Sequence, residues 1–324
     1  MPSWTGSSKD LFVSRNDPLD PRLGDRAQSI SPSNNNLSSN ADADLVLWGY
    51  PDDEGIRLNG GRVGAAEAPS EIRRVFYKLT SDPRFDHQPQ ILDAGNISLD
   101  LELAERHQQA SQWAQQVTDA NLAWVSLGGG HDYGYADGAG FLRSRLQKTN
   151  TKQLPLVLNF DAHLDVRPSE KNLNSGTPFY RLLNEFSGQF DFVELGLQPQ
   201  CNSRAHFQWA AGKGARLVML EEIEQEGLMP ILKRVLAKHL GQTLWLSLDM
   251  DAMTSNEAPG CSQSWTTGLR ARDLMKAFQW LSENFNWQAL SIYETSPALD
   301  FDNRTSKLAA QFLHRFLSCR LARR

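Results

Sequence analysis

The chain has 324 residues, with 33 Lys and Arg against 38 Asp and Glu, and its net charge is −5. That length can bury a large core, and the lack of a dense basic run, apart from the short ending RLARR, argues against nucleic-acid binding. No segment approaches the roughly 18 uninterrupted apolar residues of a membrane span and no apolar leader is visible, so we expect no membrane insertion and a cytoplasmic protein.

Residues 1–44 form a polar segment in which SISPSNNNLSSNADAD is the most polar stretch. Apolar side chains are too sparse there to build a core. We interpret this segment as an N-terminal arm that precedes a folded domain over residues 45–324. Trp4, Leu11 and Phe12 are the residues through which part of the arm can dock.

From residue 45 onward, short apolar runs alternate with longer stretches of helical period. Helices are expected over residues 101–120 and 229–241, among others. The apolar runs predict strands over residues 45–50, 91–95, 123–129, 156–163, 191–197, 216–221, 243–251 and 289–294. This alternation predicts one α/β domain with a mostly parallel sheet.

Three of these strands end in clusters of metal-competent side chains. The endings read GGGHD, DAHLD and SLDMD, and they contain His131, Asp161, His163, Asp165, Asp249 and Asp251. In an open parallel sheet, ligands collect at the carboxyl ends of the strands. Residues two apart in a strand point to the same side, so Asp161, His163 and Asp165 are expected to line up where the second strand ends and its loop begins. A divalent ion between them would offset their mutual repulsion.

Two histidines and four aspartates are the donor set expected for Mn²⁺ or a similar ion. Six ligands are too many for one ion with open positions but suit two, which can lower the pKa of a shared water. The pattern therefore indicates metal-assisted hydrolysis. The alternative for DAHLD alone is a polar loop that caps the next helix, and AspxAsp alone is a weak signal.

The remaining histidines and the cysteines are interpreted as structural. Five histidines are expected to be satisfied core residues: His87, His107, His206, His239 and His314. The three cysteines, Cys201, Cys261 and Cys319, are far apart and odd in number, so neither a disulfide framework nor a CxxC zinc site is expected.

The ordered trio GGGHD, DAHLD and SLDMD resembles the ureohydrolase family of arginase, agmatinase and formimidoylglutamase. The resemblance extends from about residue 45 to the end, and it implies a three-layer α/β/α domain. It is strongest for the formimidoylglutamase branch, which splits N-formimidoyl-L-glutamate into L-glutamate and formamide. NGGRVGA at 59–65, GGGH, DAHLDVR, SGTPF at 175–179 and NEAPG at 256–260 point to that branch.

The resemblance implies two manganese ions. His131, Asp161, Asp165 and Asp249 would hold one, while Asp161, His163, Asp249 and Asp251 would hold the other. Asp161 and Asp249 would bridge them. Asp251 would also orient the nucleophile and pass its proton to the departing amine.

Glu294, in YETSP, matches the family glutamate that pairs with a cationic amidine or guanidinium group. A carboxylate can accept charge-assisted hydrogen bonds from such a planar cation. The alternative is a strand-end acid paired with a nearby Arg.

Recognition of the substrate carboxylates needs fixed donors, and Arg suits bidentate binding better than Lys. Arg167 is the leading candidate, followed by Arg181 and by Arg204 with Asn202 beside it, and Arg62 is a further possible contact. Any of these arginines can instead be structural.

Two departures from the family pattern are visible. Ser175 stands where arginases and agmatinases carry a His, so no histidine proton shuttle is available there. Thr254 and Ser255 replace the Asp-Pro that usually follows the third motif. Neither change removes a proposed ligand.

Other functions of the same fold stay open. Another guanidino or amidino hydrolase, releasing urea, is the nearest alternative, and a non-catalytic metal-binding member is a more distant one. A small-molecule amidine is the expected partner. Because family members are commonly trimers or hexamers, a homo-oligomer is a further expectation.

Overall fold

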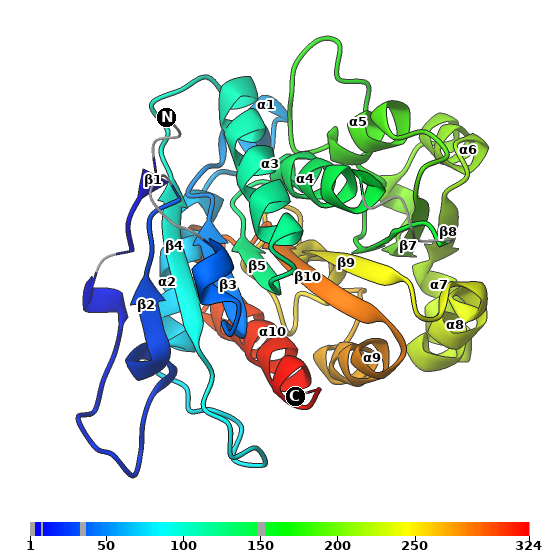
Figure 1. Ribbon diagram of the computed structural model, residues 1–324. Coiled ribbons are helices and arrows are strands. Elements are labelled where there is room, and N and C mark those ends of the chain that lie inside the picture. The colour runs from blue at the N-terminus through cyan, green and yellow to red at the C-terminus, as the bar shows by residue number, and fades with distance from the viewer. Residues whose placement is uncertain (1–3, 8, 33–36, 148–152, 324) are drawn as a thin grey trace.

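A sheet of ten strands runs through the centre of the computed structural model, which describes residues 4–7, 9–32, 37–147 and 153–323 (Figure 1). The strands are β1 Trp4–Thr5, β2 Ala27–Ser29, β3 Leu45–Gly49, β4 Ile91–Ile97, β5 Trp124–Leu127, β6 Leu156–Phe160, β7 Asp191–Leu197, β8 Arg216–Met219, β9 Thr243–Asp249 and β10 Asn286–Tyr293.

The main path of the sheet has the order β1-β4-β3-β5-β10-β9-β6-β7-β8, and β2 also pairs with β4. Among the ten described strands, every pairing is parallel except that of β1 with β4. Strands far apart in the sequence are therefore neighbours in the sheet: β5, β10, β9 and β6 lie side by side, and their carboxyl ends meet at one edge. This arrangement confirms the predicted mostly parallel sheet.

Helices cover both faces of the sheet and give three layers (Figure 1). The helices are α1 Glu54–Leu58, α2 Ala68–Phe76, α3 Leu103–Asp119, α4 Tyr133–Gln147, α5 Pro178–Glu185, α6 Arg204–Gly212, α7 Leu220–Glu226, α8 Leu228–Val235, α9 Ala271–Asn284 and α10 Arg304–Leu321. One core packs α3, α4 and α5 against the sheet, and a second core packs α2 and α7 to α10 against its other face. The predicted three-layer α/β class is confirmed.

The eight predicted strands are all present, but the ends of two differ in a way that matters for the site. The strand predicted over 156–163 ends at Phe160, and the one predicted over 243–251 ends at Asp249. In each case the first Asp accepts a hydrogen bond from the backbone N–H two residues later: His163 to Asp161 Oδ1 at 2.7 Å, and Asp251 to Asp249 Oδ1 at 2.8 Å. These turns end the strands, so the predicted sharing of one strand face by the ligands was wrong.

Part of the segment 1–44 joins the sheet. β1 and β2 both pair with β4. Aromatic contacts also hold the arm to the domain: the ring centroids of Trp4 and Trp113 are 6.0 Å apart, and Phe12 packs edge-on against Tyr77 with 5.1 Å between the ring centroids. Residues 1–3, 8 and 33–36 of this segment lie outside the described residues.

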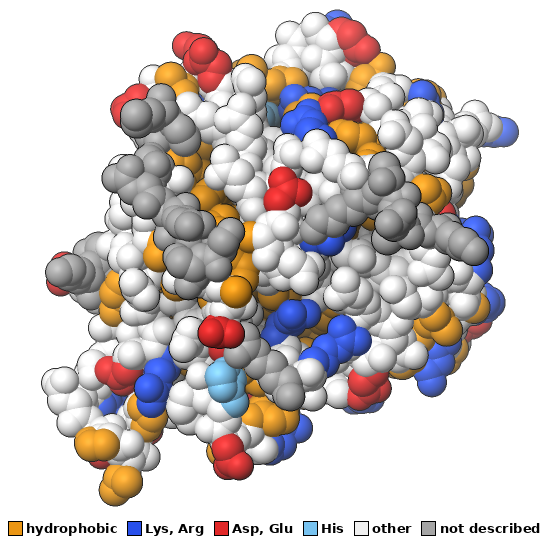
Figure 2. All heavy atoms as spheres, in the orientation of Figure 1, with side chains coloured by type: hydrophobic (Ala, Val, Ile, Leu, Met, Phe, Trp, Pro, Cys, Tyr) orange, Lys and Arg blue, Asp and Glu red, His pale blue; other side chains and the backbone are white. Residues whose placement is uncertain are grey.

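The distribution of charged side chains on the surface and the character of the helices are consistent with the composition. On the face shown in Figure 2, acidic and basic side chains are interspersed instead of being separated by sign. Within the described ranges, no helix has the length and apolar character needed to cross a membrane. All three cysteines are free thiols.

Candidate metal centre and active-site pocket

The three predicted motifs meet at the carboxyl edge of the sheet. His131 follows β5, the DAHLD motif follows β6, and Asp249 and Asp251 stand at the end of β9 and in the short 3-10 helix Met250–Ala252. The parallel pairing of these strands with one another and with β10 brings the motifs together. Two groups of side chains there have the composition and spacing to hold a metal ion.

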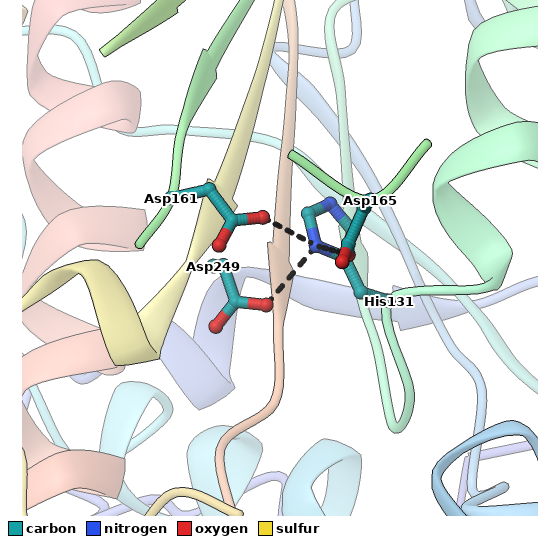
Figure 3. A group of neighbouring side chains, drawn as sticks. All are labelled: His131, Asp161, Asp165 and Asp249. Carbon is teal, nitrogen blue, oxygen red and sulfur yellow. Dashed lines mark ion pairs between the residues drawn. The ribbon is translucent and has the colours of Figure 1, made fainter. Parts of the chain in front are cut away.

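The first group is His131, Asp161, Asp165 and Asp249, whose side chains point toward one another in Figure 3. His131 Nδ1 lies 3.1 Å from Asp161 Oδ2, 3.1 Å from Asp165 Oδ2 and 3.0 Å from Asp249 Oδ2. Behind the ring, His131 Nε2 lies 2.9 Å from the Ser247 hydroxyl. A hydrogen on Nε2 that donates to Ser247 leaves the Nδ1 lone pair directed at the three carboxylates.

The second group is Asp161, His163 and Asp251. His163 Nδ1 lies 3.0 Å from Asp251 Oδ2 and 3.5 Å from Asp161 Oδ1. Asp161 is the residue common to both groups, with one carboxylate oxygen facing each histidine. Asp249 belongs to the first group alone, and its other oxygen accepts the Asp251 backbone N–H; its proposed role as a second bridge stays a prediction.

The charges in this cluster call for a cation. Burial and the negative charge of Asp161 raise the pKa of Asp165 to about 6. Burial alone would lower the pKa of His131, but hydrogen bonding to Asp161, Asp165 and Asp249 outweighs it and raises that pKa well above its usual value. Asp251 Oδ1 is buried, and no group in the described part of the chain hydrogen-bonds to it. This oxygen and nitrogen donor set, without a thiolate, matches a hard divalent ion such as Mn²⁺.

Glu294 lies next to the first group in an unusual backbone conformation. Its φ of 62° is left-handed, and its own N–H donates to Gly129 O at 2.9 Å, while its Oε1 accepts the His131 backbone N–H at 3.0 Å. Burial raises the pKa of Glu294 to about 8, against the effect of the hydrogen bond from His131. A non-glycine residue at positive φ in a buried site is strained, and such strain concentrates at functional positions.

A cavity of about 300 Å³ opens onto both groups. Its wall includes Glu294 and the predicted metal ligands His163, Asp165, Asp249 and Asp251, and it also includes Ser175, where arginases carry His. Among the residues that line this cavity, Arg167 is the one Lys or Arg. The cavity therefore combines acids at the metal groups with a single permanent cation.

Arg167 is free to bind a ligand. Its guanidinium has no hydrogen-bond or ion-pair partner among the described residues. The side chain passes over Gly176, where an added Cβ would lie 2.7 Å from Arg167 Cδ and 2.9 Å from Nε. Gly176 thus leaves the room that Arg167 occupies.

The other predicted substrate contacts are placed differently. The Asn202 side chain lines the cavity but is engaged by three backbone hydrogen bonds, from Leu164 N–H and to Ala162 O and Gln198 O. Arg204 begins α6, is exposed, and does not line the cavity.

Arg181 and Arg62 contact other parts of the protein. The Arg181 guanidinium stacks on the Tyr135 ring and donates to His107 Nδ1 at 3.1 Å, away from the cavity lining. Arg62 donates to the backbone carbonyls of Cys261 and Ser262.

The structure also brings in residues that sequence reasoning missed. His206, interpreted above as a core histidine, lines the cavity, and burial and the charge of Arg167 lower its pKa. No sequence signal marks it. Ser247 could have been found, because it lies two residues before Asp249 on β9 and so faces the same side of the strand.

The fold and the site together define a metal-dependent α/β hydrolase. The arginase family model matches residues 43–319, so the chain belongs to the arginase family, as the three motifs indicated. It is thus a ureohydrolase, a class that acts on amidino C–N bonds.

The similarity to individual relatives extends over nearly the whole chain. The formimidoylglutamase of Staphylococcus haemolyticus is 30% identical over 320 residues, covering 97% of this chain and 99% of that one. The formimidoylglutamase of Klebsiella pneumoniae is 29% identical and covers 96% of this chain and 97% of that one. A crystal structure of Trypanosoma cruzi formiminoglutamase with Mn²⁺₂ superposes with a TM-score of 0.79 at 27% identity, covering 93% of this chain and 98% of that chain.

Proposed function

We propose that this protein hydrolyses N-formimidoyl-L-glutamate to L-glutamate and formamide and uses two manganese ions. The observation that carries the proposal is the charge arrangement of the cavity. Glu294 lies beside the metal groups, where a cationic amidine would react, and Arg167 stands in the same wall, where a carboxylate end would bind. The names of the relatives above support the same reaction.

The residues divide into roles. His131, Asp161, Asp165 and Asp249 would hold one ion, and Asp161, His163 and Asp251 the other, with Asp249 as a further ligand of the second. Two divalent ions held by these residues would lower the pKa of a bound water and polarise the reacting group. Asp251 Oδ1, which is buried and has no partner within the described ranges, would orient the attacking water and pass a proton to the departing amine.

A cationic amidine beside Glu294 would favour its ionised form over the neutral acid, and the carboxylate would then hold the planar N–C–N cation by charge-assisted hydrogen bonds. Arg167 would bind a glutamate carboxylate, and its planar guanidinium allows a bidentate contact. Asn202, Arg204 and Arg181, the other substrate contacts predicted from sequence, have the placements described above, so Arg167 is the contact on which the proposal relies.

Product identity tests the proposal. The Mn²⁺-loaded protein is incubated separately with N-formimidoyl-L-glutamate, arginine, agmatine and guanidinobutyrate, and glutamate, formamide and urea are quantified. We expect glutamate and formamide from the first compound and no urea from the others. Asp251→Asn serves as a control that should be folded and inactive.

Two other outcomes would contradict the proposal in different ways. Urea from a guanidino compound would keep the metal-assisted chemistry but replace the substrate. No product from any of the four, in a protein that binds Mn²⁺, would favour the non-catalytic alternative.

A further inference from the structure

A row of polar side chains crosses the sheet just below the metal groups. Asn159 on β6 is the direct partner of Glu194 on β7 and of Ser247 on β9. Ser247 pairs with Ser291 on β10, which pairs with Ser126 on β5. Five adjacent strands thus carry a polar residue at one level, and each of the five is 0% exposed.

Asn159 and Glu194 are the costly members of this row. Asn159 Nδ2 donates to Glu194 Oε1 at 2.6 Å, but Asn159 Oδ1 and Glu194 Oε2 are buried and have no hydrogen-bond partner among the residues that the structure describes. Unpaired buried oxygens destabilise a fold, and an apolar pair would avoid that cost in a sheet that is otherwise buried. Stability of the core therefore does not account for the pair.

The pair reaches the metal groups through Asp161. An Asn amide carries two hydrogens, and Asn159 Nδ2 also lies 3.3 Å from Asp161 Oδ2. That oxygen faces His131, whereas Asp161 Oδ1 faces His163 and accepts the His163 backbone N–H. One donor on each oxygen fixes how the Asp161 carboxylate is rotated between the two groups.

We propose that Asn159, held in place by Glu194, is a positioning residue that sets the carboxylate of Asp161 for two divalent ions. The inference rests on the metal site of the proposed function but not on its substrate. Partners behind a ligand commonly orient it, and their loss costs about 10–100-fold in metal affinity. Among the described residues, the side-chain hydrogen bond of Glu194 is the one that it accepts from Asn159, so its hydrogen-bonded link to Asp161 runs through the Asn159 amide.

Mn²⁺ titration of the metal-depleted protein by calorimetry tests the inference without any substrate. Asn159→Ala should weaken Mn²⁺ binding about 10–100-fold. Glu194→Ala should weaken it less, and the double variant should bind no more weakly than Asn159→Ala, because both residues act on Asp161 through one amide. Glu194→Gln, which keeps the accepting oxygen, should bind nearly as the unmodified protein does.

Gln288 offers a matched control. It is a buried amide on the same sheet, its Oε1 has no hydrogen-bond partner among the described residues, and its Nε2 donates to Leu122 O at 3.2 Å. Gln288→Ala should lower the melting temperature as Asn159→Ala does, yet leave Mn²⁺ affinity unchanged. If Asn159→Ala does not fold, Asn159→Ser, whose short hydroxyl cannot reach both acceptors, is titrated in its place.

The titration distinguishes failure of the proposed metal site from failure of the positioning inference. If the unmodified protein binds no Mn²⁺, both the metal site of the proposed function and this inference are overturned. Mn²⁺ binding that is equally tight in Asn159→Ala and Gln288→Ala would overturn the positioning inference alone, as would losses from Asn159→Ala and Glu194→Ala that multiply in the double variant.

Discussion

Asp161 differs from the other predicted ligands because its two oxygens face different histidines. Asp165 contributes to the first group alone, through Oδ2, and its φ of 48° places it in the left-handed region. Losing Asp161 therefore affects both groups, whereas losing Asp165 affects one. The sequence named both residues but gave no means to rank them, because the ranking depends on which oxygen faces which histidine.

Asp161→Asn should abolish tight binding of both ions, while Asp165→Asn should retain about one of them. We expect activity to fall more than about a hundredfold in Asp161→Asn, since even changes behind a ligand cost about 10–100-fold in affinity. Metal content after dialysis, measured by elemental analysis, gives the stoichiometry, and circular dichroism checks the fold. Two tightly bound ions in Asp161→Asn would show that Asp161 does not link the groups.

Gly176→Ala should weaken substrate binding without touching a metal ligand. The added Cβ would lie within 3 Å of the Arg167 side chain and displace it. Arg167→Ala should raise KM about 10–100-fold, as expected for loss of about 1.5–3 kcal/mol from a hydrogen bond to a charged group, and Gly176→Ala should give a smaller rise in KM with kcat little changed. Unchanged KM in both variants would exclude Arg167 as the carboxylate contact.

The interiors of the strands could be predicted from the sequence, but the arrangement of the predicted metal ligands could not. Runs such as LVLNF and TLWLSLD are apolar because their strands are buried on both faces. The ligands lie in turns after those strands, and these turns depend on side-chain hydrogen bonds of Asp161 and Asp249 that no periodicity reveals. β1 and β2 were missed because two or three residues that pair through their backbones leave no hydrophobic pattern.

The β7–α6 connection is held against the ligand loop by Asn202. Its three hydrogen bonds to residues 162, 164 and 198 contribute about 1 kcal/mol each. Asn202→Ala should therefore loosen the loop that carries His163, lower activity at limiting Mn²⁺, and recover it at excess Mn²⁺ with KM unchanged. Steady-state kinetics over a range of Mn²⁺ concentrations make the measurement, with Arg204→Ala as the control on the neighbouring helix.

A rise in KM at full metal occupancy in Asn202→Ala would instead support the direct substrate contact that the sequence predicted. The two roles are separable because a loop that positions a ligand affects metal binding first, whereas a contact residue affects the substrate alone.

Metal binding should raise the free energy of unfolding of the whole molecule. A ligand that binds only the folded state adds about 2.7 kcal/mol at one hundred times its Kd, which corresponds to about 4 °C in Tm for a chain of this size. Removing Mn²⁺ with a chelator should lower Tm by that amount, and added Mn²⁺ should restore it. Differential scanning calorimetry makes the measurement, and an Asp161→Asn protein whose Tm does not respond to Mn²⁺ is the control.

The same stabilisation should depend on pH, with protons and metal competing for one cluster. The folded-state pKa of Asp165 is raised to about 6, above an unfolded value of about 4, so the metal-free fold binds the extra proton and loses stability as pH rises between these values. The raised pKa of His131 acts in the same direction at higher pH. Mn²⁺ binds the deprotonated ligands, so its gain in Tm should be larger at about pH 8 than at about pH 5. An equal gain at both pH values would show that these groups do not bind the metal.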